Sequence, residues 1–278
     1  MSIPAQPSDP LFRRGEIARG AFSYTDEGDG PVIVAVPGYP GGPRDFRWLA
    51  PALGGKARLI RLAMPGFGET PLETGPETTL AGRAAFVAAV LEALDLENVL
   101  LLGHSMGGAI AGHAAHLAPA RVAGLALVCS IGPLPHPTVR GRRMQVGAAL
   151  ARRPLCGAPI RAMLPRLFAQ LGFPPVWTLP QLLHTLDCAA ALDFPAWANV
   201  ISQLSLPTAV LWAEDDAIIP PAISRALADA APQGPRIAFA TGGHNIQKHH
   251  ACELAEVLRG LVVQTAGEGE PDSPASSS

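Results

Sequence analysis

The stretch that decides the fold is Val99-Leu100-Leu101-Leu102-Gly103-His104-Ser105-Met106-Gly107-Gly108, together with the alanine-rich run that follows it. Residues 99–102 are Val and Leu without interruption, which predicts a strand buried on both faces. Residues 106–117 are small and alanine-rich and stop before Pro119, so we expect a helix there. The sequence therefore predicts a tight turn at residues 103–107 that joins a buried strand to a helix.

The same alternation continues on both sides of this turn. Runs rich in β-branched and aliphatic residues predict further strands at residues 32–36, 59–64, 122–129, 208–212 and 236–240. Apolar residues three or four positions apart predict helices at residues 80–94, 221–231 and 254–262, and residues 13–25 are expected to add a hairpin. Strands that alternate with helices predict an α/β protein, with a mostly parallel sheet that helices cover on both faces.

The composition excludes several classes of protein. Of 278 residues, 48% are hydrophobic and only 16% are charged, which suits a large core and excludes a disordered chain or a coiled coil. The net charge of -2 argues against a nucleic-acid partner. No apolar run approaches the roughly 18 residues that a membrane span needs. Residues 1–10 lack a basic region followed by an apolar stretch, so we expect no signal peptide and a cytoplasmic protein.

Residues 133–203 interrupt the alternation of strands and helices. They are rich in proline, predict several short helices, and hold seven arginines and two aspartates but no lysine or glutamate. We expect three parts: a core domain formed by residues 1–132 and 204–265, a helical arginine-rich cap at 133–203, and a disordered tail at 266–278. The cap arginines have three interpretations: they recognise an anionic substrate, they lie against an anionic membrane surface, or they are solvated.

The turn at residues 103–107 is the strongest chemical signal. A serine between a strand and a helix, in the pattern Gly-x-Ser-x-Gly, has its hydroxyl lifted above the edge of the sheet. The glycines at positions 103 and 107 let neighbouring backbone pass close by, and the first N–H groups of the next helix point towards the site. We therefore predict that Ser105 is a nucleophile.

A serine nucleophile needs a base, and the base needs an anion to orient it. His244 follows the last predicted strand and precedes the last helix, which favours it as the general base. The strand at residues 208–212 leads into three acidic residues, of which we prefer Asp216 as the partner of His244 and place Asp215 second. The order serine, acid, histidine along the chain is the one expected for this arrangement.

The other roles at this site follow from position. The backbone N–H groups of Met106 and Tyr39 are expected to form the oxyanion hole, since Pro40 has no N–H to give. His104 is expected to be structural, His113 and His116 to lie in the helix after the nucleophile, and His249 and His250 to begin the final helix. Cys129, Cys156, Cys188 and Cys252 form no CxxC pair, so we expect free thiols and no metal site.

These motifs, in this order, resemble the α/β-hydrolase superfamily. The resemblance covers about residues 15–264 and includes the serine turn, the segment from Asp216 to Pro220, the Gly243-His244 loop and the Pro-Gly-Phe-Gly stretch at residues 65–68. It implies an eight-stranded, mostly parallel sheet with a helical cap inserted after the sixth strand. The chain departs from the family pattern at two places. Members usually have His where this chain has Pro37, and they usually have an Asp just before the Pro-Gly-Phe-Gly stretch, which this chain lacks.

The resemblance implies a serine hydrolase that cleaves an ester or related acyl bond through an acyl-enzyme intermediate, without a metal or cofactor. Haloalkane dehalogenases and epoxide hydrolases of this fold use Asp where this chain has Ser105. Carboxylesterases, lactonases, thioesterases, C–C hydrolases, acyltransferases and cofactor-free perhydrolases remain open, as does a binding or accessory protein. The apolar cap residues favour a small to medium hydrophobic acyl or aryl substrate, which is anionic if the arginines recognise it, and peripheral membrane contact through the cap is a further alternative.

Overall fold

A computed structural model describes residues 11–136, 141–155 and 157–267. Its centre is an eight-stranded sheet in the order β1-β2-β4-β3-β5-β6-β7-β8. The strands β1 and β2 form an antiparallel hairpin, β2 pairs antiparallel with β4, and every later pairing is parallel. The strands are β1 (Arg13–Ile17), β2 (Gly20–Glu27), β3 (Val32–Val36), β4 (Arg58–Leu62), β5 (Val99–His104), β6 (Val122–Val128), β7 (Thr208–Ala213) and β8 (Arg236–Phe239).

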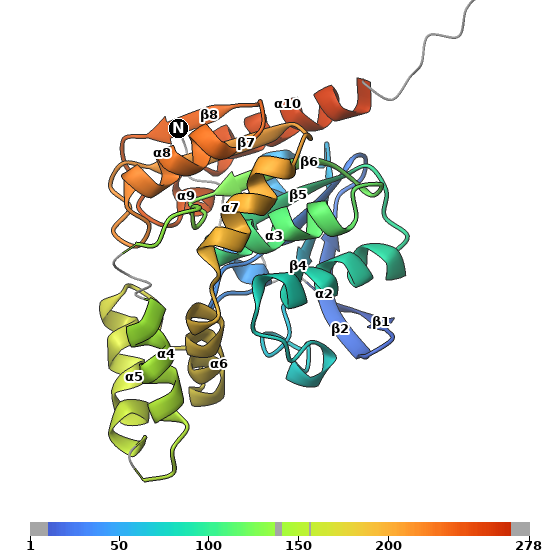
Figure 1. Ribbon diagram of the computed structural model, residues 1–278. Helices are drawn as coiled ribbons and strands as arrows, with labels where there is room; N and C mark the ends of the chain where they lie inside the picture. The colour runs from blue at the N-terminus through green and yellow to red at the C-terminus, as the bar shows by residue number, and fades with distance from the viewer. Residues whose placement is uncertain (1–10, 137–140, 156, 268–278) are drawn as a thin grey trace, which may run out of the picture.

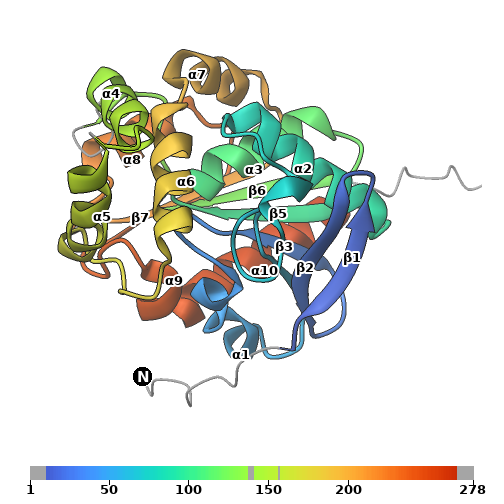
Figure 2. The same ribbon diagram turned by 90° about the horizontal axis from the view of Figure 1, so that it is seen from below.

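Helices cover both faces of this sheet, as Figure 2 shows from below. On one face lie α2 (Leu80–Ala93), α3 (Met106–Leu117), α7 (Phe194–Gln203) and α8 (Pro221–Ala230), whose apolar side chains share one core cluster. On the other face lie α1 (Leu49–Leu53), α9 (Ile246–His249) and α10 (Ala251–Gly267), with a second cluster. Two short 3₁₀ helices, η1 (Pro43–Phe46) and η2 (Leu72–Thr74), lie in loops. The strands between them are buried on both sides, which explains their uninterrupted aliphatic runs.

Three helices stand apart from the layered body at its lower left in Figure 1. They are α4 (Gly141–Ala151), α5 (Ala158–Gln170) and α6 (Leu179–Ala190), and they pack on one another through a small cluster that includes Ala151, Leu164 and Leu186. The next helix, α7, behaves differently, because its fully buried Trp197 lies against Gly112 of α3 and belongs to the main core. The predicted division into a core and a cap at 133–203 stays a prediction.

The predicted α/β architecture is confirmed, including the hairpin and the parallel sheet. The prediction for His249 and His250 is wrong: His249 ends the short helix α9, and His250 lies before α10. His250 is held outside the helix because its Nε2 bonds the carbonyl of Thr241 and its ring stacks on Phe239. α10 extends to residue 267, two residues into the predicted tail, and residues 268–278 lie outside the described part of the chain, as do residues 1–10.

No helix in the described residues is long and apolar enough to cross a bilayer. Cys129, Cys188 and Cys252 are free thiols, as predicted, while Cys156 lies outside the described residues.

Candidate active site

Ser105 stands in a strained turn between β5 and α3. Its backbone has φ 56° and ψ -125°, a region that residues with a side chain adopt rarely. The turn is held because the Ser105 N–H donates to the carbonyl of Val128 and the Ser105 carbonyl accepts from Gly108 and Ile131. Glycine is required beside it, since a Cβ on Gly107 would lie 2.3 Å from the carbonyl oxygen of Val36.

His244 and Asp216 form a buried pair at the same edge of the sheet. His244 Nδ1 lies 2.8 Å from Asp216 Oδ2, and both side chains are almost wholly withdrawn from solvent. The other carboxylate oxygen accepts the N–H groups of Ile218 and Ile219 at 2.8 and 2.9 Å. Burial raises the pKa of Asp216, but His244 and these two N–H groups outweigh it and hold the pKa below its ordinary value. Asp216 therefore stays ionised and fixes the orientation of the His244 ring.

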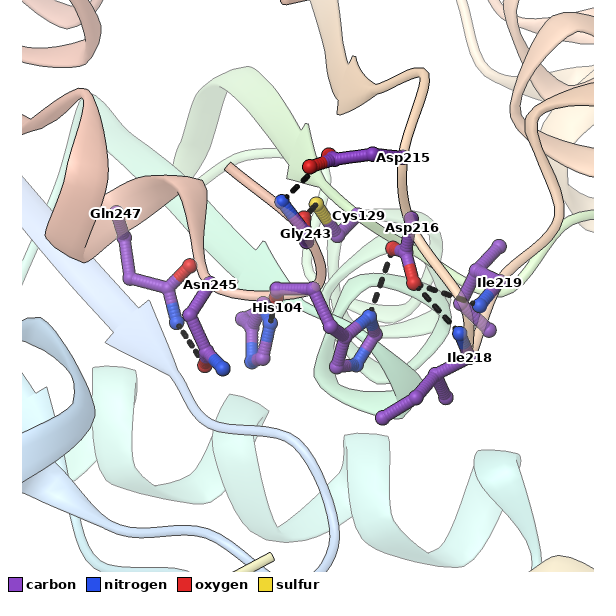
Figure 3. Close-up of polar contacts among 10 residues, drawn as sticks. His104, Cys129, Asp215, Asp216, Ile218, Ile219, Gly243, Asn245 and Gln247 are labelled. Atoms are coloured by element: carbon purple, nitrogen blue, oxygen red, sulfur yellow. Dashed lines mark hydrogen bonds and ion pairs between the residues drawn. The ribbon is translucent and has the colours of Figure 1, made fainter. Parts of the chain in front are cut away.

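Asp215 has a different task from its neighbour. Figure 3 shows the two carboxylates at the end of the same strand with different partners. Asp215 accepts the N–H groups of Gly242 and Gly243, so it anchors the loop that carries His244. The two carboxylates that the sequence left as alternatives thus divide the work: Asp216 touches the imidazole and Asp215 the loop.

Tyr39 and Met106, whose N–H groups are predicted to form the oxyanion hole, both lie beside Ser105. Met106 is the first residue of α3, and both Tyr39 and Met106 line a cavity with Ser105. The Tyr39 ring is buried, and its hydroxyl accepts a hydrogen bond from Arg83, whose guanidinium also meets Nε2 of His184 on α6. Burial raises the pKa of Tyr39, so the phenol stays neutral.

His104 and His113 have structural contacts. His104 Nε2 donates to the carbonyl of His244 at 2.7 Å, and burial lowers the pKa of His104 to about 3. His113 stacks on Trp197 in the core, whereas His116 is exposed. His113 and His116 both lie in α3, the helix after Ser105, as predicted.

Two cavities meet at Ser105. The first, of about 100 Å³, is almost entirely apolar and is bounded by α5 and α6 on the side away from the sheet. The second, of about 70 Å³, is lined by His244, Asp45, His104 and Asn245 among others. Tyr39, Ser105, Phe173 and Ile218 border both. The second cavity also shares Asp45, Pro174 and Trp177 with a larger hollow of about 480 Å³. Ser105 is thus open to an apolar space on one side and a polar one on the other.

One set of potential metal ligands lies within the described residues, formed by Cys129, Asp216 and His244 with their ligand atoms within 4.8 Å of one another. The set is a poor fit to a cation. Asp216 and His244 are already bonded to each other, and burial raises the pKa of the Cys129 thiol, which keeps its proton and faces the carbonyl of Gly243. We read Cys129 as packing behind the His–Asp pair.

Comparison with known proteins gives the family. Residues 31–150 match the family described as the alpha/beta hydrolase fold. The chain is also 31% identical over 246 residues to a protein named putative carbamate hydrolase RutD of Klebsiella pneumoniae, covering 82% of this chain and 90% of that protein. The chain belongs to the α/β-hydrolase family.

Two further proteins are similar to the chain. It is 31% identical over 270 residues to the dihydrolipoyllysine-residue acetyltransferase component of the acetoin cleaving system of Pseudomonas putida, covering 91% of this chain and 70% of that protein. A solved esterase from Thermogutta terrifontis superposes with a TM-score of 0.71 at 21% identity, covering 93% of this chain and 99% of that one. At this identity the superposition shows the fold alone.

Two residues that line the cavities at Ser105 were not predicted from the sequence. Asp45, in η1, accepts the N–H of Gly42 at 2.8 Å and lines the polar cavity, and burial raises its pKa to about 6. His136 lines the apolar cavity. His136 follows the strand next to the one that ends at Ser105, so its position after a parallel strand is a signal that could have found it.

Proposed function

We propose that this α/β hydrolase cleaves an ester or related acyl bond, with Ser105 as nucleophile, His244 as base and Asp216 as the acid that orients it. His244 takes the proton of Ser105 as the hydroxyl attacks the carbonyl carbon. The N–H groups of Tyr39 and Met106 hold the oxyanion, His244 returns the proton to the leaving group, and water releases the acyl-enzyme. No step needs a metal or an organic cofactor.

One observation carries the proposal: the second nitrogen of His244, Nε2, is buried and has no hydrogen-bond partner among the described residues, while its Nδ1 is fixed by Asp216. His244 lines the same small cavity as Ser105. A buried polar atom without a partner destabilises the fold, so its presence calls for an explanation such as a catalytic role. Accepting the proton of Ser105 is a task that this nitrogen can perform.

The two cavities suggest how the substrate lies. His244, which protonates the leaving group, borders only the polar cavity, so we assign the leaving group to that side and to the larger hollow beyond it. The acyl group then occupies the apolar cavity of about 100 Å³. An engineered cavity of about 150 Å³ holds benzene, so the acyl group is small and of a few carbons.

The cap proposed at residues 133–203 supplies the outer wall of this apolar cavity through Leu167, Phe168, Leu171 and Leu186. Of its arginines, the four with described side chains do not line either cavity. Arg152 pairs with Asp187, and Arg161 bonds backbone carbonyls at the end of α4 and beyond it. We therefore propose a neutral rather than an anionic acyl group.

Acyl transfer is the second candidate function. The Pseudomonas relative is named an acetyltransferase component, and transfer shares the acyl-enzyme intermediate with hydrolysis. The two differ only in whether water or another acceptor releases the acyl group. A binding protein that keeps these residues without turnover is the remaining alternative.

The test is the mass of the intact protein after treatment with a fluorophosphonate, followed by acid release from methyl esters of short acids. We expect one adduct on the wild type, none on Ser105→Ala, and slow labelling of His244→Ala. The matched controls are Ser202→Ala and His249→Ala, which remove an exposed serine and an exposed histidine and should label like the wild type. A folded wild type that forms no adduct would favour the binding protein, and an adduct without ester hydrolysis would favour acyl transfer.

A further inference from the structure

His136 is a buried polar side chain with nothing to bond. The residue is 4% exposed, and neither Nδ1 nor Nε2 has a hydrogen-bond partner among the described residues. Its ring contact is an edge-on approach to Phe194, with 6.3 Å between the ring centres. Most buried imidazoles bond at least one neighbour, so two unmet nitrogens on one ring call for an explanation.

The ring lines the apolar cavity beside Ser105, and the other polar groups there are occupied. The Thr185 hydroxyl donates to the carbonyl of Gln181, and the Tyr39 hydroxyl accepts from Arg83. Ser105 carries the reacting oxygen in the proposed mechanism. Within the described lining of this cavity, His136 is therefore the polar side chain left for a ligand.

We propose that His136 recognises the acyl group of the substrate by hydrogen bonding a neutral polar substituent on it, such as a hydroxyl or keto oxygen. This inference rests on the proposed hydrolase function and narrows it, from small apolar acyl groups to short hydroxyacyl or oxoacyl groups. A neutral imidazole offers one N–H donor and one acceptor, which matches a hydroxyl in either direction and a keto oxygen through the donor.

The surroundings of the ring select against a carboxylate substituent. Burial, and then the charge of His244, lower the pKa of His136 to about 4, so the ring carries no positive charge near neutral pH. No lysine or arginine lies among the residues that line the cavity. A carboxylate would enter this apolar space without a countercharge, which costs free energy. A hydroxyl or keto oxygen replaces its hydrogen bond to water by one to His136, so its transfer into the cavity costs little.

The experiment compares three methyl esters of matched size on the wild type, with acid release followed in a pH-stat: methyl butanoate, methyl 3-hydroxybutanoate and monomethyl succinate. We expect kcat/KM for the hydroxy ester to exceed that for butanoate by about tenfold or more, with succinate the poorest. This comparison needs no variant, so it stands even where a substitution disturbs folding. Equal rates on butanoate and the hydroxy ester, or a preference for either other ester, would overturn the inference.

Two variants connect the preference to His136. In His136→Leu the ratio of kcat/KM for the hydroxy ester to that for butanoate should fall to about one, and His136→Gln should keep part of the preference. A loss of rate on both esters in equal proportion would mean that His136 is only structural. Fluorophosphonate labelling separates the two failures: an unlabelled wild type refutes the hydrolase, whereas a labelled wild type without the preference refutes only the role of His136.

Discussion

At the scale of single residues, Asp215 and Asp216 show how one position changes a carboxylate's task. Asp216→Asn should lower kcat by about 10⁴-fold, because an amide can hold the imidazole in the wrong tautomer and cannot stabilise its positive charge. Asp215→Asn keeps an oxygen facing Gly243 and should stay within about tenfold of the wild type. Steady-state kinetics on one ester, with far-UV circular dichroism as a check of folding, compares them. Equal losses would refute the division of roles.

Asp45 makes a prediction about stability and pH. Its pKa is raised from 3.8 to about 6 chiefly by burial, so the folded state binds its proton more tightly than the unfolded state does. The stabilisation is therefore complete below pH 4 and is lost as the pH rises through 6. Asp45→Asn, which still accepts from Gly42, should raise the free energy of unfolding by about 1–2 kcal/mol at pH 8 and leave it unchanged at pH 4. Urea unfolding at the two pH values measures this, and equal effects at both would contradict it.

The sequence predicted the positions of Ser105 and His244 because each follows a strand with a pronounced apolar pattern and precedes a helix. The sequence did not decide whether Asp215 or Asp216 contacts His244. The direction of a side chain in a loop depends on its contacts, here with Ile218, Ile219 and the His244 loop, and no sequence pattern shows these contacts. His136 was not predicted as a site residue because the cavity that it lines is closed by α5 and α6, which lie further along the chain.

At the scale of helices, the junction of α3 and α7 sets how closely the insert meets the core. Gly112 allows α7 to approach α3 closely, because a Cβ there would lie 2.4 Å from the ring of Trp197. The Trp197 side chain is fully buried and donates a hydrogen bond to the carbonyl of Ile131. Gly112→Ala should therefore destabilise the protein by about 1–3 kcal/mol, despite the better helix propensity of alanine.

The matched control is Gly260→Ala in α10, where a new Cβ meets no atom within 4 Å. There the gain in helix propensity acts alone, so we expect stabilisation by about 0.5–1 kcal/mol. Thermal and urea unfolding of the two variants should give shifts of opposite sign. Stabilisation by Gly112→Ala would mean that Trp197 moves aside without cost.

Most strands and helices of the sheet domain could be predicted from the sequence. Predicted strands at 32–36, 99–102 and 208–212 agree with β3, β5 and β7 to within two residues, because strands buried on both faces have uninterrupted aliphatic runs. The insert was harder, since its short helices carry weak periodicity. Nothing in the sequence indicated that α7 would leave its neighbours and pack through Trp197 on α3.

For the whole molecule, four buried histidines govern stability in mild acid. Burial lowers the pKa of His104 to about 3, of His136 and His184 to about 4, and of His113 below its ordinary value. The unfolded chain therefore binds more protons than the folded one as the pH falls below about 6.5. His104, His136 and His184 should each cost about 1–2 kcal/mol at pH 5. His113 acts in the same direction, and the sum outweighs the opposite contribution of Asp45.

We expect the free energy of unfolding to fall by several kcal/mol between pH 7 and pH 5. Urea unfolding at pH 7, 6 and 5 measures the slope of the unfolding free energy against pH. His136→Gln should reduce that slope by the contribution of one proton, because one titrating ring is removed. A flat profile over this range would show that these rings are charged or solvated in the folded protein.

The cavity beside Ser105 has two walls of different origin. Tyr39 and Ser105 come from loops at the edge of the sheet and Met106 from the first turn of α3. Phe168 and Leu186 come from α5 and α6, which the chain inserts between β6 and β7. Mutation can therefore reshape the second wall without disturbing the first. In evolutionary terms, substitutions in the inserted helices can change which compounds fit the cavity while the residues beside the sheet stay the same, so relatives can come to act on quite different compounds.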